Sequence, residues 1–393
     1  MKNKISIVLL ALAVVSCGKS GNKEEVTTNQ EEKEIAVGVL ADKNATAQTV
    51  TLYKNLFKLR EKGYMFGHQD DLAYGVEWKY EEGRSDVKDV TGDYPAVYGW
   101  DIGRIENNAD KNLDGVPFDK MRQFIKEVYD RGGVNTISWH VNNPLSGGDS
   151  WDNPEGTVAS VLPGGSKHEV YKGWMDNAAA FFLSLKGSDG NLVPILYRPY
   201  HEFTGDWFWW CKNTTSPEQF KELWKFTVDY FEQKGVHNLI YVYNTSDANV
   251  KTKADFLEYY PGDEYVDMMS FDVYQTGEGE KLKEYTDNVH SLVGVMQGAA
   301  QEHGKLTAIA ETGYEAIPYE KWWTETLTNA IGDYKISYVL VWRNLGWNEY
   351  MNPPRMHYYA PYSGHAHKAD FVEYYNQDRV LFQKDVTKEN LYQ

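Results

Sequence analysis

The arrangement of apolar segments constrains the fold of this chain more than any other feature. Eight short and nearly continuous apolar runs follow one another between residues 64 and 344, and amphipathic stretches separate them. Runs of this kind are typical of parallel strands that are buried on both faces. The predicted strands are Tyr64–Gln69, Ala96–Asp101, Val134–His140, Val193–Glu202, Asn238–Asn244, Val266–Tyr274, Leu306–Gly313 and Ile336–Asn344.

The stretches between these runs have helical character. Phe118–Arg131 carries apolar residues at helical spacing, and Ser216 followed by Pro217 is a helix-start signal for Glu218–Lys234. Repeated β-then-α units predict an α/β fold of the (β/α)₈ TIM-barrel type. Because no segment between about 48 and 385 has the composition of a linker, residues 48–393 are predicted to form a single catalytic domain.

The N-terminus has the features of a targeting segment. Lys2 and Lys4 precede the apolar run Ile5–Val15, and the residues up to Cys17 resemble a bacterial lipobox. We therefore expect residues 1–16 to be a lipoprotein signal peptide, Cys17 to be lipidated, and residues 17–47 to form a flexible linker. This predicts a protein held by its lipid anchor to the outer membrane, at the cell surface or on the periplasmic face.

Charge and aromatic content limit the classes of ligand that the protein is expected to bind. The formal net charge of −17 disfavours nucleic acid and suits a neutral ligand. Aromatic residues make up 15% of the chain, and flat rings can cover the apolar faces of sugars. Cys211 is the only thiol left besides Cys17, so no internal disulfide is expected. We also expect a monomer without a cofactor or a metal.

Polar and aromatic side chains gather at the C-terminal ends of the predicted strands. Active sites of (β/α)₈ barrels lie at that face, because the loops that follow the strands converge there. If the strands are correct, these residues surround one site. They are His68, Asp101, His140, His201, Glu202, Asn244, Tyr274, Glu311, Trp342 and Arg343.

Glu202 and Glu311 are the candidate catalytic residues. Each ends an apolar strand, where a carboxylate costs burial energy unless it has a task. Cleavage of a glycosidic bond needs one protonated carboxyl group and one ionised carboxylate. The alternative is that both are structural ion-pair residues, with Arg198 or Arg343 as partners.

The segments around both glutamates resemble one family. Arg198-Pro-Tyr-His201-Glu202-Phe-Thr-Gly-Asp-Trp207 is similar to the acid/base motif of glycoside hydrolase family 26, whose members include endo-β-1,4-mannanases. Ile309-Ala-Glu311-Thr-Gly is similar to its nucleophile motif. The resemblance implies a retaining double displacement on mannan, galactomannan or glucomannan, with Glu202 as acid/base and Glu311 as nucleophile.

The same resemblance suggests roles for other residues. Tyr274 would hydrogen-bond the nucleophile, Arg198 would add positive potential, and Trp342 would form the floor beneath the sugar at the cleavage site. Residues that would contact sugar directly are His140, His201, Trp207 and Arg343. Further residues that could shape the site are Trp139, Trp151, Trp209, Trp210, Asn344 and Trp347.

Three alternatives remain open at this stage. The first is another family 26 specificity, a β-1,3-xylanase or a mixed-linkage glucanase. The second is a metal-dependent barrel hydrolase, because His68, His140 and His201 all lie near strand ends and three histidines can bind zinc. The third is a non-catalytic glycan-binding lipoprotein. The loop 142–167 could extend or block the binding groove, which leaves internal cleavage versus mannobiose release from chain ends undecided.

Overall fold

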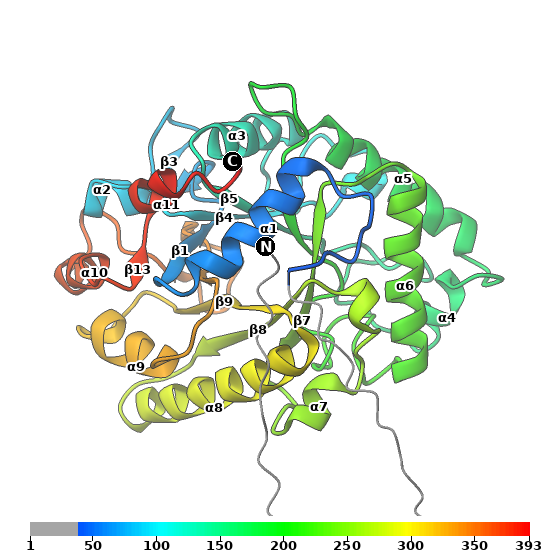
Figure 1. Cartoon of the computed structure of the whole chain (residues 1–393). Coiled ribbons are helices and arrows are strands. Elements are labelled where there is room, and N and C mark those ends of the chain that lie inside the picture. Colours follow the sequence, from blue (N-terminus) through cyan, green and yellow to red (C-terminus); the bar gives the residue numbers. More distant parts are fainter. Residues whose placement is uncertain (1–37) are drawn as a thin grey trace, which may run out of the picture. The chain divides into compact units, whose positions relative to one another are not determined.

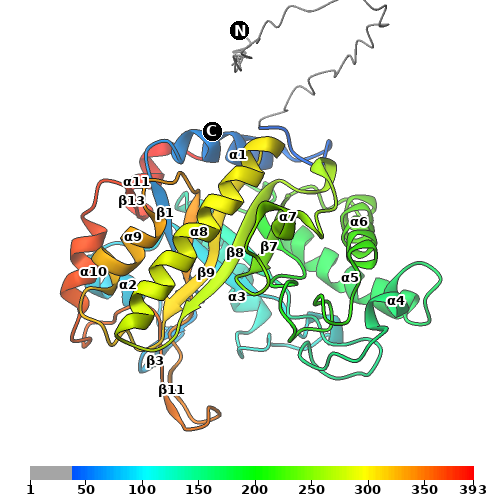
Figure 2. The same ribbon diagram turned by 90° about the horizontal axis from the view of Figure 1, so that it is seen from below.

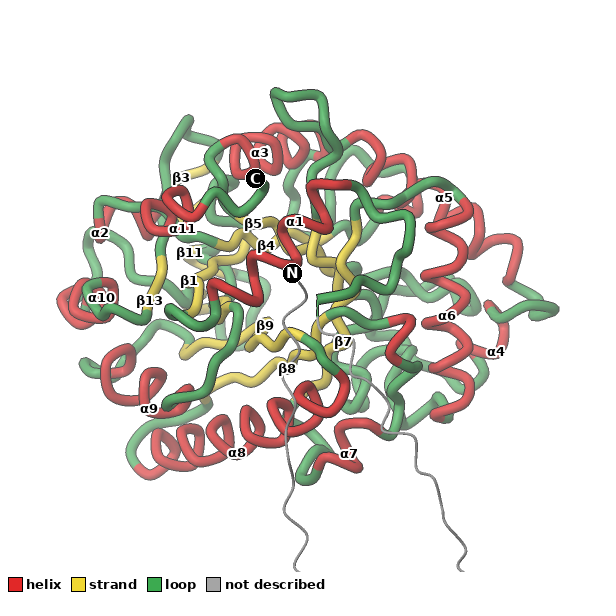
Figure 3. Tube along the Cα trace, viewed as in Figure 1, coloured by secondary structure: helices red, strands yellow, loops and turns green. Residues whose placement is uncertain are grey.

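The computed structural model describes residues 38–393. The predicted signal peptide, Cys17 and most of the predicted linker lie outside the described residues. In the described part, eight parallel strands pair in the order β10-β9-β8-β7-β6-β5-β4-β1, and β10 also pairs with β1, which closes the barrel (Figures 1 and 3). The predicted (β/α)₈ fold is therefore confirmed. The barrel strands are β1 Tyr64–Gln69, β4 Val97–Asp101, β5 Val134–Ser138, β6 Ile195–Arg198, β7 Leu239–Ser246, β8 Met268–Gln275, β9 Leu306–Tyr314 and β10 Tyr338–Val341.

Helices surround the barrel (Figure 3). The structure has α2 Asp86–Thr91, α3 Phe118–Asp130, α4 Thr157–Val161, α5 His168–Ser184, α6 Pro217–Gln233, α7 Lys253–Leu257, α8 Glu280–His303, α9 Thr328–Ile331, α10 Lys368–Tyr375 and α11 Gln383–Glu389, with η1 Ile105–Asn107, η2 Asp263–Tyr265 and the π-helical turn η3 Trp322–Leu327. Helix α6 begins with a capping box, in which the Ser216 side chain accepts from the Gln219 amide and the Gln219 side chain accepts from the Ser216 amide.

Five of the eight predicted strands are longer than the observed ones, and the largest differences at the C-terminal end are in β6 and β10. Strand β6 ends at Arg198 instead of Glu202, and β10 ends at Val341 instead of Asn344. In both cases the polar residues at the end of the apolar run belong to the loop that follows the strand.

Helix α1, Ala47–Leu59, covers the N-terminal end of the barrel (Figure 1). Its Leu52 and Leu56 belong to the apolar cluster that fills the barrel interior. The residues just before α1 also pack here, since Leu40 and Ala41 are buried and the Ala41 amide donates to Asp267 Oδ1 at 2.7 Å. The linker predicted to reach residue 47 therefore ends before Leu40.

Short hairpins extend from two loops at the opposite, C-terminal end. Strands β2 Tyr74–Gly75 and β3 Trp78–Lys79 form one after β1. Strands β11 Gly346–Asn348 and β12 Arg355–His357 form the other after β10, and Figure 2 shows it projecting at the end of the barrel away from α1. Strand β13, Val380–Leu381, pairs with β1 at the outside of the barrel.

Candidate active site

The structure brings the two candidate glutamates together. One carboxylate oxygen each of Glu202, Asp272 and Glu311 lies within 4.8 Å of the others. Carboxyl groups about 5–5.5 Å apart characterise retaining glycosidases, whereas inverting enzymes keep them about 6.5–9.5 Å apart to admit a water. The close approach of the Glu202 and Glu311 oxygens fits the shorter, retaining separation.

Left-handed backbone positions Glu202. After β6 ends at Arg198, Tyr200 and Glu202 adopt φ values of 51° and 57°, which are costly for residues with a side chain. The Tyr200 hydroxyl hydrogen-bonds those of Tyr171 and Thr227, and the Glu202 amide donates to the Asn244 carbonyl at 2.9 Å. These contacts hold the turn in its strained form and aim the Glu202 carboxyl across the strand ends.

A β-bulge positions Glu311. Ala308 and Ala310 of β9 face the barrel interior, so strict alternation would turn Glu311 outward. Between the pairs Phe271–Ile309 and Asp272–Glu311 the register shifts by one residue, which turns Glu311 inward beside Asp272. The next residue, Thr312, accordingly points outward and hydrogen-bonds Tyr285 of α8.

Two donors hold the Glu311 carboxylate. The Tyr274 hydroxyl donates to Glu311 Oε2 at 2.8 Å, and Arg198 Nη2 donates to Glu311 Oε1. Arg198 also contacts Asp272 at 3.2 Å and the Asn244 side chain at 3.2 Å. Burial and the charge of Glu311 raise the pKa of Asp272 well above its usual range despite this contact. Arg198 thus bridges the side chains of Glu311 and Asp272.

Glu202 has the opposite environment. Burial and the nearby charge of Glu311 raise the pKa of Glu202 from 4.5 to about 7, and the Trp207 indole opposes the shift by donating to Glu202 Oε2 at 2.7 Å. The Trp207 ring lies so close to Gly205 that a Cβ there would come within 2.4 Å of it. Glu202 can thus hold a proton near neutral pH, as a general acid must.

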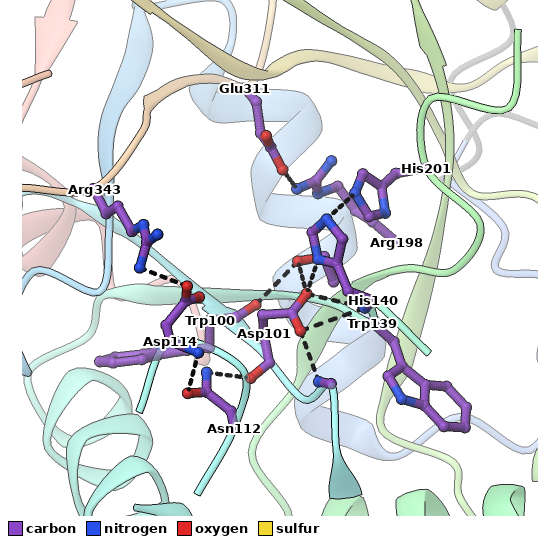
Figure 4. A network of polar contacts seen from close by, with 12 residues as sticks. Trp100, Asp101, Asn112, Asp114, Trp139, His140, Arg198, His201, Glu311 and Arg343 are labelled. Carbon is purple, nitrogen blue, oxygen red and sulfur yellow. Dashed lines mark hydrogen bonds and ion pairs between the residues drawn. The ribbon is translucent and has the colours of Figure 1, made fainter. Parts of the chain in front are cut away.

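Asp101, His140 and His201 form a chain of buried polar contacts that leads to the residue before Glu202 (Figure 4). His140 Nδ1 lies 2.7 Å from Asp101 Oδ2, and His140 Nε2 lies 3.2 Å from His201 Nε2. Asp101 also accepts from the Ser138 hydroxyl and the Gly103 amide, so it serves as acceptor throughout and His140 Nδ1 carries a proton. Burial lowers the pKa of His140, but Asp101 outweighs it and the net shift is upward. Burial and the neighbouring His140 lower the pKa of His201 well below its usual range.

Arg343 and Trp342 lie at the end of β10 on the other side of Glu311. Arg343 Nη1 forms an ion pair with Asp114 at 2.5 Å (Figure 4). The same nitrogen donates a hydrogen bond to the Tyr74 hydroxyl at 3.3 Å. Trp342 follows the inward-facing Tyr338 and Leu340 in the alternation of β10, and its side chain is partly exposed. Both residues directly follow the C-terminal end of β10, and their contact with sugar stays a prediction.

The remaining tryptophans divide into two groups. Trp139, Trp209 and Trp210 are buried, and their indole groups donate to Glu106, the Val141 carbonyl and the His201 carbonyl, so they support the site from behind. Trp151 is 49% exposed and stacks on His140 with ring centroids 5.2 Å apart. Trp347 is exposed on the β11 hairpin.

Two of the residues predicted to surround the site, Asn344 and His68, do not face it. Asn344 is buried and bonds Asp86 and the backbone of Ala360. His68 lies two residues after Phe66 in β1, so its side chain points outward as that of Phe66 does. Its Nδ1 lies 2.7 Å from Asp71 Oδ1. Within residues 38–393, the one group of three or more potential metal ligands is Glu202, Asp272 and Glu311, which contains no histidine. The three histidines of the zinc alternative are therefore not gathered into a ligand set.

Three carboxylates of the site were missed by sequence analysis in their actual roles. Asp272 precedes Tyr274 by two residues, so strand alternation could have placed both on one face. Asp101 was noticed at a strand end but not as the partner of His140. Asp114 lies in the loop between β4 and α3, and the local sequence pattern does not predict its ion pair with Arg343.

The chain is similar to known proteins over most of its length. The model of "Glycosyl hydrolase family 26" matches residues 41–358. A mannan endo-1,4-beta-mannosidase of Bifidobacterium adolescentis is 32% identical over 280 residues, which cover 70% of this chain and 28% of that protein. One from Bacillus subtilis is 31% identical over 229 residues, which cover 54% and 58%. The match thus spans less than two thirds of either relative. The solved structure of a GH26 beta-mannanase from Bacteroides ovatus superimposes with a TM-score of 0.83 at 44% identity, covering 88% of this chain and 98% of that one.

Proposed function

Because this chain belongs to glycosyl hydrolase family 26, we propose that it is a retaining endo-β-mannanase that hydrolyses internal β-1,4-mannosidic bonds of mannan, galactomannan or glucomannan. The single observation that carries the mechanism is the approach of Glu202 and Glu311 to within 4.8 Å. The relatives from Bifidobacterium adolescentis and Bacillus subtilis are named for this activity, and the Bacteroides ovatus structure is that of a beta-mannanase.

The reaction takes two steps at these side chains. Glu311 attacks the anomeric carbon while Glu202 gives its proton to the glycosidic oxygen, so the bond to the leaving sugar breaks and an ester to Glu311 forms. Glu202 then removes a proton from water, the water oxygen attacks the same carbon, and Glu311 leaves as a carboxylate. Two inversions give retention of configuration.

The surrounding residues assist each step. Tyr274 and Arg198 hold the Glu311 carboxylate in position for attack through their hydrogen bonds and ion pair. Burial and Glu311 keep Glu202 protonated before it donates. We assign sugar contacts to His140, His201, Trp207, Trp342 and Arg343, which lie around the two carboxylates at the strand ends.

Two variants and a substrate panel test the proposal. Glu202→Ala and Glu311→Ala should each lose nearly all activity on linear β-1,4-mannan while keeping the circular dichroism spectrum of the folded wild type. Products from mannan, galactomannan, β-1,3-xylan and mixed-linkage glucan identify the substrate. Hydrolysis of xylan or glucan but not mannan would select another specificity, and wild-type rates in both variants would refute the catalytic assignment.

We also propose that the mature protein is a monomer anchored by a lipid on Cys17 to the outer membrane. The sequence from Lys2 to Cys17 supports the anchor. None of the helices within residues 38–393 has the length and hydropathy of a membrane span. The test is to express a Cys17→Ser variant in a bacterium that lipidates such proteins and to measure its membrane association. It should move from the membrane to the soluble fraction and lose incorporation of labelled fatty acid; unchanged membrane association would contradict the anchor.

A further inference from the structure

Exposed aromatic side chains are concentrated at one end of the barrel. Within residues 38–393, the large hydrophobic side chains that stay exposed are Val39, Trp151, Val170, Trp347 and Tyr350. The aromatic three belong to loops that follow β5 and β10, at the end where Glu202 and Glu311 lie. Trp151 stacks on His140 and so belongs to the site already described. Trp347 and Tyr350, 64% and 90% exposed, are not explained by it.

The hairpin that carries this pair is anchored on both faces: Met356, paired with Trp347, packs against the apolar core, and the other face forms ion pairs. Arg355 Nε and His357 Nδ1 of β12 both lie 2.7 Å from the Glu315 carboxylate. Opposite them in β11, Gly346 and Asn348 are buried, and a Cβ on Gly346 would lie 3.7 Å from the Glu77 amide. Strand residues alternate between faces, so Trp347 points away from the ion-paired side. The structure therefore orders the hairpin while leaving the Trp347 ring free.

The hairpin is continuous with the catalytic residues. It begins three residues after Arg343, and Trp347 lies within about 18 Å of Trp342 even for a fully extended chain. At its other end, the rings of His357 and Tyr359 pack with their centroids 5.2 Å apart. The rings of Tyr359 and Tyr274 pack with their centroids 5.6 Å apart. Figure 2 shows the hairpin projecting beyond the barrel at this end.

We propose that Trp347 and Tyr350 form a distal sugar-binding subsite for the same glycan chain that is cut between Glu202 and Glu311. This inference rests on the proposed function. Large aromatic rings offer a flat apolar face with little entropy to lose, which suits stacking on the apolar face of a neutral sugar ring. The subsite lies on the Arg343 side of the cleavage point and takes sugars beyond the one that Arg343 would contact.

Charge favours a glycan over a membrane as the occupant. Glu349 lies between the two aromatic residues, no Lys or Arg lies between Gly346 and Pro354, and the chain has a net charge of −17. An anionic lipid surface would be repelled, whereas an uncharged polysaccharide would not. A long linear glycan bound between Glu202 and Glu311 must also extend beyond the catalytic site. Its outer sugars then reach the loops at this end of the barrel.

Chain-length dependence tests this subsite. The measurement is kcat/KM of the full-length wild type, the double variant Trp347→Ala/Tyr350→Ala and the control Val170→Ala on linear manno-oligosaccharides from the trimer to the hexamer. We expect the double variant to lose roughly tenfold on the hexamer, the order of one aromatic stacking contact, and less than about twofold on the shortest substrate cleaved. Val170→Ala, an exposed side chain of α5, should match the wild type at every length.

The possible outcomes separate the two proposals. Equal loss at all lengths, or no loss on the hexamer, overturns the distal subsite. A double variant that cleaves every length normally but loses binding to anionic lipid vesicles overturns it in favour of a membrane contact. If the wild type cleaves no manno-oligosaccharide, the proposed function fails instead, and the same length series on the β-glycan that it does cleave decides the subsite.

Discussion

The indole of Trp207 offers the sharpest test of how the protonation of Glu202 is set. Its Nε1–H donates to Glu202 Oε2 at 2.7 Å, and this bond favours the ionised form of the carboxyl group. Trp207→Phe keeps an aromatic ring beside the site but removes the donor. The pKa of Glu202 should therefore rise further from its value of about 7.

The size of the shift follows from hydrogen-bond energies. A hydrogen bond to a charged group contributes about 1.5–3 kcal/mol, and one to a neutral group about 0.5–1.5 kcal/mol. The protonated carboxyl group keeps the weaker bond in the wild type, so the net loss to the ionised form is about 1–1.5 kcal/mol. Since 1.36 kcal/mol corresponds to one pKa unit, the pKa should rise by roughly one unit.

The assay is the pH dependence of kcat/KM on a manno-oligosaccharide. Activity that requires protonated Glu202 falls as the pH rises through the pKa of this group, so the alkaline limb should lie near pH 7 in the wild type and about one unit higher in Trp207→Phe. Trp151→Phe is the matched control, because Trp151 contacts His140 and Phe208 but not Glu202. A limb that stays in place, or moves to lower pH, refutes this account of Glu202.

Three further predictions concern Glu311, its cation and the protonation of Glu202. Tyr274→Phe removes the 2.8 Å bond to Glu311, so kcat/KM should fall by about 10–100-fold with little change in the unfolding temperature; an unchanged rate would contradict the role of Tyr274. Arg198→Met leaves the buried carboxylates without their cation and should lower the free energy of unfolding in urea by about 3–5 kcal/mol, while Lys283→Met, from an exposed pair on α8, should change it by less than about 1 kcal/mol; similar values for both would contradict the buried network. Because the pKa of Glu202 rises from 4.5 to about 7 on folding, wild-type stability should fall as the pH rises through this window; Glu202→Gln escapes that loss and should be up to roughly 3 kcal/mol more stable at pH 8, with no difference below pH ~4. Equal urea stability of the two proteins at pH 8 would show that Glu202 is not held protonated.

The barrel could be predicted from sequence because its strands are buried on both faces. Each strand is then a nearly continuous apolar run, and such runs contrast sharply with the amphipathic helices between them. The strand ends were harder, since β6 and β10 stop where the polar residues begin. A run such as Val193–Glu202 does not reveal that its last residues turn into left-handed backbone.

The site was predictable in its residue types but not in its backbone. Inward-facing Ala308 and Ala310 would send Glu311 outward in a regular strand, and only the bulge in β9 reverses this. The extra residue is visible in the pairing with β8, which involves residues about 40 positions away along the chain. Local pattern therefore points to Glu311 without explaining how it reaches the site.

Side-chain partners were the least predictable part. Trp139, Trp209 and Trp210 resemble groove residues in sequence, yet they are buried and bonded behind the site, while Trp151 and Trp347 are exposed. The residue type is the same in each case, and only the packing of the loops around each ring separates them. For the same reason, Asp114 could not be paired with Arg343 before the loop between β4 and α3 was placed.

The configuration of the first product tests the central claim most directly. The measurement is proton NMR of the anomeric region during the first minutes of manno-oligosaccharide hydrolysis, before the free sugar mutarotates. Attack by Glu311 followed by attack of water predicts that the β-anomer appears first and the α-anomer only later. Initial formation of the α-anomer would mean a single displacement, and Glu202 and Glu311 could not then act as described.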